Sequence, residues 1–432
     1  VTAKMEQTRY HFVGELSLTN SILSGINTRA AYTDYQHREL EGEEVGTTFT
    51  NETFQIKTDL LLAEFNEWHG AISLEYKASD FEAIGEEAFT PPSKSESYSS
   101  GLLAEKHFGD VLVQLGARIE HVDIKPVVHE ELHGAHEESE DEEHLELSSM
   151  SFSPLSVSGG LVWDFKQGFN AGVSYTYAQR APSAAELFAN GPHIGTNTYE
   201  IGAAYQIHSD GDEVHLELNE RELELETSSN LEFSLRKFEG DIGFIVNLFY
   251  NQIDDYYYQS NTLLNSGELH DEHDEHDEHD GNSLPIYIFN SENVELYGYE
   301  AQFIWQATTD FKITTQADAI WSELDNGDHL PRTPPTRVGL NLNYQRSNLG
   351  IDLDIMNYAR QDDVAPYETP TKGYNLVDLY VNYDFELSQF ELTSFIKVTN
   401  MFDQEARVHT SFLKNETLLP GRNITIGIRG SL

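Results

Sequence analysis

Apolar and polar residues alternate strictly along residues 336–344, Thr-Arg-Val-Gly-Leu-Asn-Leu-Asn-Tyr. Val338, Leu340, Leu342 and Tyr344 occupy every second position, with small, polar or charged residues between them. Successive side chains of a β-strand point to opposite faces, so this segment has one apolar and one polar face. Such a strand fits a soluble sandwich, where the apolar face meets another sheet, or a membrane barrel, where it meets lipid.

The same alternation recurs along the 432 residues of the chain. It predicts about 17 strands, among them 110–124, 241–257 and 421–432, and no amphipathic helix of ordinary length. The 22 Tyr and 23 Phe suit strands and the aromatic girdles of a barrel. No run of about 18 apolar residues occurs, so no transmembrane helix is expected, which leaves a membrane barrel possible.

The connections between these segments alternate between short and long. Short turns are predicted around Asn20 and 107–110, whereas long polar gaps such as 125–148, 181–228 and 258–292 follow every second strand. Outer-membrane barrels have short periplasmic turns and long extracellular loops, whereas a soluble sandwich has no reason to gather its long loops at one end. The pattern therefore predicts an all-β fold, a transmembrane antiparallel β-barrel surrounded by outer-membrane lipid.

The alternation of loops also assigns a direction to each strand. The last strand follows a long loop, so it runs from the outside to the periplasm, and counting back makes the first strand run inward as well. Single-chain bacterial barrels have an even number of strands. We therefore expect residues 1–432 to form the C-terminal part of a barrel that lacks its first strands.

The net charge of the chain is −48, from 26 Lys and Arg against 74 Asp and Glu. This charge would repel phosphates, which argues against nucleic acid as a partner, and it suits the capture of cations. The chain has no Cys, so disulfide and thiolate chemistry are excluded.

Two tracts rich in His and acidic residues carry the clearest chemistry. Imidazole binds zinc, copper and nickel, carboxylate tolerates zinc, and both tracts fall in predicted outer loops. The histidines are His129, His133 and His136 in one tract and His270, His273, His276 and His279 in the other. We interpret both as low-affinity metal collectors; the alternative is a solvated anionic loop. For the acidic stretch 210–226, a solvated loop and a metal role are both open.

Several motifs resemble those of TonB-dependent outer-membrane receptors. Residues 177–187, Tyr-Ala-Gln-Arg-Ala-Pro-Ser-Ala-Ala-Glu-Leu, resemble the arginine-alanine-proline segment in the middle of that family's barrel. Residues 249–256 and 297–301 resemble the strands that follow it, and 400–406 and 420–428 resemble its closing hairpin. Arg180, within the first motif, is expected to satisfy carboxylates rather than to contact a substrate.

Within this family the chain is most similar to the zinc-uptake receptors, in residues 34–42, 45–49, 189–193 and 408–414. Such receptors have an N-terminal plug with a TonB box, followed by a 22-stranded barrel. The resemblance implies that the plug and roughly five strands are absent from this chain. It also implies that a zinc ion is the transported ligand and that the TonB complex acts through the absent plug.

The same resemblance matches His193 to a zinc ligand of the family. His37, Glu39 and Glu41 follow the second predicted strand at the same outer rim, where one of the carboxylates would face His193 across the lumen mouth. A tetrahedral zinc takes about four ligands, so the others would come from the absent plug. The alternative for His193 is an ordinary surface residue, and His409 is a further candidate ligand.

Import of zinc driven by TonB is therefore the leading hypothesis. The alternatives within the fold are receptors for copper, nickel, haem or a siderophore, and Phe188 near His193 keeps haem open. An enzyme is disfavoured, since no Gly-x-Ser-x-Gly occurs and residues 129–133 carry the letters of His-Glu-x-x-His in an acidic loop rather than a helix. A structural or adhesive surface protein is a third class.

Overall fold

The computed structural model describes residues 2–19, 21–42, 44–85, 88–127, 147–193, 195–210, 213–269, 283–387 and 390–431. In these residues, twenty strands form one sheet, and β12 (Tyr205–Asp210) and β13 (Glu213–Leu218) form a separate hairpin. Three of the twenty strands are short, namely β7 (Met150–Phe152), β10 (Asn190–His193) and β11 (Thr198–Ile201). The other 17 make up the wall, which confirms the predicted number.

The wall strands are β1 (Thr2–Ser17), β2 (Leu23–Glu41), β3 (Glu44–Leu62), β4 (His69–Gly85), β5 (Ser93–Phe108), β6 (Val111–Pro126), β8 (Leu155–Lys166), β9 (Phe169–Arg180), β14 (Glu226–Lys237), β15 (Ile242–Asn265), β16 (Pro285–Thr308), β17 (Phe311–Leu324), β18 (Arg337–Arg346), β19 (Leu349–Tyr358), β20 (Tyr374–Leu387), β21 (Phe390–Thr399) and β22 (Asn423–Ser431). Each pairs antiparallel with the next along the chain, as in β1 with β2, β9 with β14 and β21 with β22. The predicted antiparallel meander is therefore confirmed.

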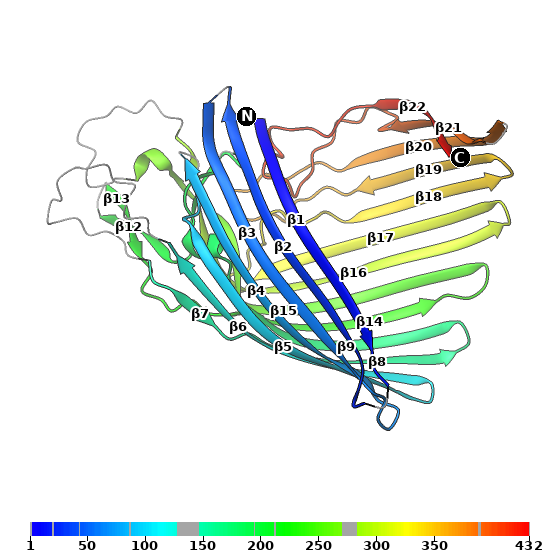
Figure 1. Cartoon of the computed structure of the whole chain (residues 1–432). Helices are drawn as coiled ribbons and strands as arrows, with labels where there is room; N and C mark the ends of the chain where they lie inside the picture. The colour runs from blue at the N-terminus through cyan, green and yellow to red at the C-terminus, as the bar shows by residue number, and fades with distance from the viewer. Residues whose placement is uncertain are drawn as a thin grey trace.

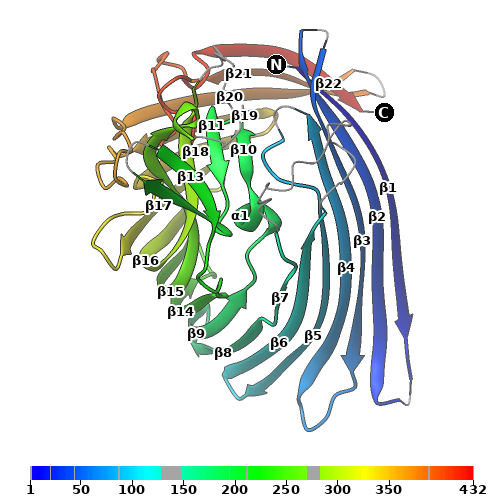
Figure 2. The same cartoon turned by 90° about the vertical axis from the view of Figure 1, so that its left-hand side faces the viewer.

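The sheet curves around an interior, with β1 at one edge and β22 at the other (Figures 1 and 2). In the described residues, no pairing joins these two edge strands. Figure 2 shows α1 (Ala184–Phe188), β10 and β11 inside the curve. β11 is held there by parallel pairing with β16, in which Tyr199 lies opposite Ile286.

Short turns join the strands at one end of the wall, and the long connections gather at the other (Figure 1). β5 and β6 are joined through Gly109, whose φ is +61°, and β8 and β9 through Gly168, whose φ is +74°. Glycine reaches this left-handed region without the steric cost that a Cβ imposes. The predicted alternation of short and long connections is confirmed except between β2 and β3, where β2 runs on to Glu41 and β3 begins at Glu44. The prediction that His37, Glu39 and Glu41 follow the second strand is therefore wrong, because β2 and β3 stay paired up to Glu41 and Glu44.

The two faces of the wall differ as the sequence predicts. On one face of β18, Leu340 lies opposite Ile355 and Leu342 lies opposite Leu353. On the other face, Asn341 donates hydrogen bonds to Asp352 and Asp354 at 2.9 and 3.0 Å. On β22, Ile424, Ile426 and Ile428 are 62%, 75% and 71% exposed. An apolar surface of this extent is unusual for a soluble protein and is typical of a membrane face.

The buried side chains lie where the long connections fold over the end of the wall. One cluster contains Ile124, Phe152, Leu187, Phe188 and Ala204, all less than one-tenth exposed. Because the inner face of the wall is polar, apolar burial takes place between loops and not between sheets. No helix in the described ranges is long and apolar enough to cross a membrane.

Two predicted loops contain more regular structure than the sequence indicated. The gap 181–228 holds α1, β10, β11 and the β12–β13 hairpin, because its short alternating stretches pack on neighbouring loops. The gap 258–292 is narrower than predicted, because β15 continues to Asn265 and β16 begins at Pro285. β7 and β8 are separate strands because Pro154, which lies between them, has no backbone N–H to donate.

Candidate functional site

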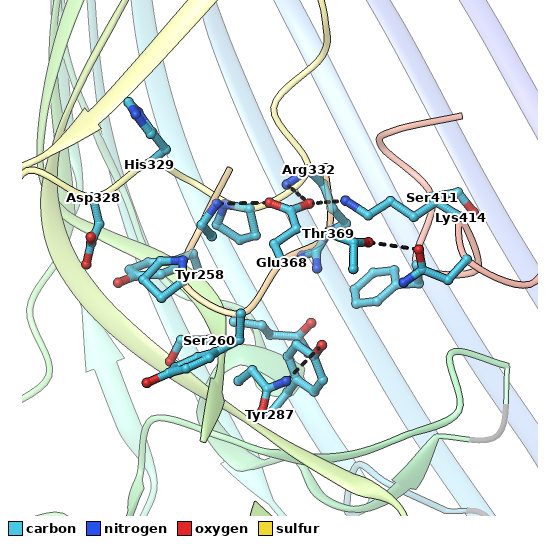
Figure 3. Close-up of a pocket in the computed structure, with 18 of the residues that line it drawn as sticks. Tyr258, Ser260, Tyr287, Asp328, His329, Arg332, Glu368, Thr369, Ser411 and Lys414 are labelled. Carbon is cyan, nitrogen blue, oxygen red and sulfur yellow. Dashed lines mark hydrogen bonds and ion pairs between the residues drawn. The ribbon is translucent and has the colours of Figure 1, made fainter. Parts of the chain in front are cut away.

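A cavity of about 270 Å³ lies among the long connections. It is enclosed by three loops, 325–336, 359–373 and 400–422, and by the ends of β15 and β16. Figure 3 shows that charged, aromatic and hydroxyl side chains meet there. The lining includes Tyr258, Tyr287, Arg332, Glu368, Phe412 and Lys414.

The side chain of Glu368 forms hydrogen bonds with residues of all three loops. One carboxylate oxygen accepts a hydrogen bond from the backbone N–H of Arg332 at 3.0 Å and from Nζ of Lys414 at 2.6 Å. The other oxygen accepts from the backbone N–H of Ala365 at 3.1 Å (Figure 3). Because Lys414 and Glu368 are both almost buried, loss of either partner would leave the other charge buried and uncompensated.

His409 is buried next to this ion pair. Its Nδ1 is 2.9 Å from the hydroxyl of Thr371, and its Nε2 is 3.4 Å from Oε1 of Glu368. Burial lowers the pKa of His409, and the charge of Lys414 lowers it further, while Glu368 opposes the shift. Burial also lowers the pKa of Lys414, and Glu368 again opposes the shift. These contacts place His409 in a structural position between the loops. The resemblance that made His409 a candidate ligand did not indicate this position.

Arg332 and Lys414 are both cations in the lining of the cavity, and Arg332 differs in its surroundings. Its backbone has a φ of 60°, a left-handed conformation that costs free energy in a residue with a side chain. Its guanidinium lies 3.8 Å from the centre of the Phe412 ring. Burial lowers its pKa, and Glu368 opposes that shift. No described carboxylate forms an ion pair with this guanidinium, so it can receive an anionic group.

Arg180 has the structural role that the sequence predicted. Its guanidinium donates to Glu186 at 2.8 Å and to Glu226 at 2.6 Å. Glu186 also accepts the backbone N–H of Ser183 at 2.7 Å, and the Ser183 hydroxyl accepts the N–H of Glu186. This capping box begins α1, so the arginine-alanine-proline motif fixes the entry of the chain into the interior.

His193 is held by a buried carboxylate on the next strand. Its Nδ1 lies 2.7 Å from Oε1 of Glu200, whose side chain is only 6% exposed. The hydroxyls of Thr196 and Thr198 donate to the same oxygen at 3.3 and 3.4 Å. The imidazole stacks on Phe89, with ring centres 4.2 Å apart and planes at 13°. A carboxylate at Nδ1 is the arrangement that directs the Nε2 lone pair of a histidine to a metal.

His37 and Glu39 lie on the same strand, β2. Nε2 of His37 is 3.8 Å from Oε1 of Glu39, and the imidazole stacks on Phe49 with ring centres 4.4 Å apart. Glu41 ends β2. Across the part of the chain that the structure describes, no group of three possible metal ligands includes His193, His37 or Glu39. Their predicted meeting across the lumen mouth stays a prediction.

The seven tract histidines lie outside the described residues, so the metal-collector interpretation stays a prediction. They are His129, His133, His136, His270, His273, His276 and His279. The structure does bring together His208, His215 and Glu217. His215 and Glu217 lie in the acidic stretch 210–226, for which the sequence left a metal role open, but none of the three was named as a candidate ligand. The alternation of apolar and polar residues along 205–218 was the sequence signal that could have indicated this hairpin.

A protein-family model described as "TonB dependent receptor-like, beta-barrel" matches residues 2–401. The chain is 24% identical over 277 residues to Heme/hemopexin utilization protein C of Haemophilus influenzae (strain 86-028NP), a match that covers 63% of this chain and 36% of that protein. Among solved structures, the copper transporter OprC aligns with a TM-score of 0.73 at 13% identity, covering 98% of this chain and 64% of that one. The FrpB iron transporter from Neisseria meningitidis aligns with a TM-score of 0.68 at 13% identity, covering 98% and 62%.

The chain thus spans about a third of the length of the curated relative and under two thirds of the solved structures. The structural likenesses show the fold, and the family model covers nearly the whole chain. The apolar outer face, the polar inner face and the gathered long loops agree with that model. This chain belongs to the TonB-dependent receptor family of outer-membrane β-barrels.

Proposed function

We propose that this chain supplies barrel wall and outer loops to a receptor that imports a metal ion, with His193 as one of the ligands. The observation that carries the proposal is the 2.7 Å contact between His193 Nδ1 and buried Glu200. When the ring is neutral, Nδ1–H donates to the carboxylate and Nε2 keeps a lone pair for a metal. Energy would come from TonB acting through a plug domain.

Zinc is our first candidate for the imported ion. The resemblance of 189–193 to zinc-uptake receptors supports it, as do the His-rich tracts, and zinc takes imidazole nitrogen readily. Copper suits the same donor, and a solved structure of similar fold is named as a copper transporter. A metal bound to His193 would complete its coordination with water, with other protein groups or with a ligand that the metal brings.

Calorimetric titration of the purified chain with Zn²⁺ tests this function. We expect His193→Asn to weaken the tightest binding phase by at least about tenfold. His121→Asn is the matched control, since His121 is an exposed wall histidine whose Nε2 lies 3.5 Å from Asp123. Equal affinity in the two variants would remove His193 from the site. A series with Cu²⁺, Ni²⁺ and Zn²⁺ then ranks the ions.

A second candidate is import of an anionic metal complex, such as haem or a siderophore. Arg332 favours it, because a guanidinium beside a cavity and over an aromatic ring can bind a carboxylate or catecholate in a bidentate manner. The curated relative is named for haem and hemopexin utilization. We expect Arg332→Gln to weaken binding of such a ligand by on the order of tenfold or more.

Absorption titration with haem tests the second candidate, since binding shifts the Soret band. Lys372→Gln is the control, because Lys372 is an exposed cation on the same loop as Glu368. A Soret shift that is equal in both variants would exclude Arg332 as the anion contact. If haem causes no Soret shift in the parent chain, haem is not a ligand of this chain.

A further inference from the structure

The β12–β13 hairpin has two chemically different faces. Tyr205 lies opposite Leu218 and Ile207 lies opposite Leu216 in the antiparallel register, so these four share one face. That face packs on the core cluster of Ile201 and Ile286, and Tyr205 itself is only 6% exposed. Its apolar contacts fix the hairpin on the receptor, so the opposite face is presented outward.

The base of the hairpin is also pinned by hydrogen bonds. The backbone N–H of Asn219 donates to the carbonyl of Ala204 at 2.8 Å, and its side-chain amide donates to the carbonyl of Ala203 at 3.0 Å. Val214, near the start of β13, forms an isolated parallel β-bridge with Leu269. The hairpin is therefore attached at its base, along its apolar face and through β13.

Two histidines and a glutamate meet on the opposite face. His208 lies directly across from His215 in the register, with ring centres 5.2 Å apart. Glu217 is two residues after His215, hence on the same face, and its Oε1 lies 3.3 Å from His215 Nε2. One ligand atom from each of the three lies within 4.8 Å of the other two.

We propose that His208, His215 and Glu217 form a binding site for a divalent transition metal on the outer loops, with zinc as the best-suited ion. Two imidazoles and one carboxylate are a common protein ligand set for zinc, whose remaining position is open to water or another ligand. Ligand atoms around a tetrahedral zinc lie roughly 3.3 Å apart. The separation between His215 Nε2 and Glu217 Oε1 has that value, and a ligand atom of His208 lies within 4.8 Å of both groups.

The site goes beyond the proposed import function, because it needs only the hairpin and does not depend on His193 or on any transport step. β pairing places His208 and His215 opposite each other before metal arrives. A cation approaching a chain of net charge −48 is concentrated near its surface, and a fixed site there would hold the ion at the loop end. The alternative is that His215 and Glu217 form an ordinary polar pair with no metal affinity.

Hydrogen–deuterium exchange of the full chain, followed in the peptide covering 205–218, tests the site locally. A metal that bridges β12 and β13 stabilises the hairpin, so we expect Zn²⁺ to slow exchange in this peptide. In the double variant His208→Asn, His215→Asn, Zn²⁺ should have no effect on it, and the bound zinc should fall by one equivalent. The control is His69→Asn with His107→Asn, two exposed histidines at the short-turn end, which should keep the response.

The exchange of the double variant without metal reports whether its hairpin is still folded. If it exchanges faster than the parent chain, Glu217→Gln replaces it as the test variant, because this substitution keeps both imidazoles and the shape of the side chain. We expect zinc affinity to fall at least about tenfold in Glu217→Gln. A zinc response of 205–218 that persists unchanged in these variants would overturn the site. Because the exchange of 205–218 reports on the hairpin alone, failure of the His193 titration would leave this result unaffected.

Discussion

Nδ1 of His193 and Oε1 of Glu200 lie 2.7 Å apart, on neighbouring strands of the β10–β11 hairpin inside the curved wall. The carboxylate is buried and the imidazole is one-third exposed, so the pair presents one edge of the ring to solvent. This relationship distinguishes His193 from the other histidines of the chain that the structure describes. It also makes Glu200 as important to the proposed metal site as the ligand itself.

We expect Glu200→Gln to weaken zinc binding at His193 by about 10–100-fold, because the amide can no longer hold the imidazole N–H with a charged acceptor. Calorimetry measures the affinity. Glu75→Gln is the control, since Glu75 is a wall carboxylate that accepts a hydrogen bond from Gln55 at 2.6 Å. If both variants bind zinc like the parent, Glu200 does not orient a metal ligand.

Glu368→Gln should loosen the three cavity loops without unfolding the wall. The substitution leaves the buried Lys414 ammonium without its ion-pair partner, which costs about 3–5 kcal/mol. We expect faster hydrogen exchange and proteolysis in 359–373 and 400–422. Asp80→Asn breaks the exposed pair with Lys94 and should leave the protection of these loops unchanged. Equal loop protection in the two variants would contradict the role of Glu368.

Acidification should open the same loops. Burial and Lys414 hold the pKa of His409 in the folded loops below its usual value of 6.5. As pH falls below 6.5, the opened form therefore takes up more protons than the folded form, and the stability of the loops falls. We expect hydrogen exchange of 400–422 to be faster at pH 5.5 than at pH 7.5, after correction for the intrinsic pH effect. His409→Gln should remove this difference; if it does not, another group titrates.

The outer face of β18 should reject charge, whereas the inner face should accept it. We expect Leu342→Arg to lower the free energy of unfolding in lipid vesicles by about 2–4 kcal/mol, since its side chain meets acyl chains. Asn343→Arg is the matched change on the next residue, where Asn343 contacts the Asp352 carboxylate at 2.9 Å. Similar losses for both, in urea titrations of the vesicle-folded chain, would show that the faces are not opposed as described.

Part of the candidate site could be read from the sequence and part could not. The resemblance of 189–193 to zinc-uptake receptors marked His193, but its partner Glu200 is one of 74 acidic residues and carries no distinguishing pattern. The contact of Glu368 with Lys414 joins residues 46 positions apart, which no local pattern reports. The structure also gives His409 a buried position on Thr371 that its motif did not suggest.

The sequence by itself determined the wall of this protein. Alternation with a period of two assigns every side chain of a strand to lipid or lumen, and the lengths of the connections place the loops at one end, because both are local properties of the chain. Tertiary structure alone decided which loop residues meet. Pairing of β12 with β13 sets His208 against His215, and folding of three loops onto Glu368 creates the cavity, since these contacts depend on how distant segments pack.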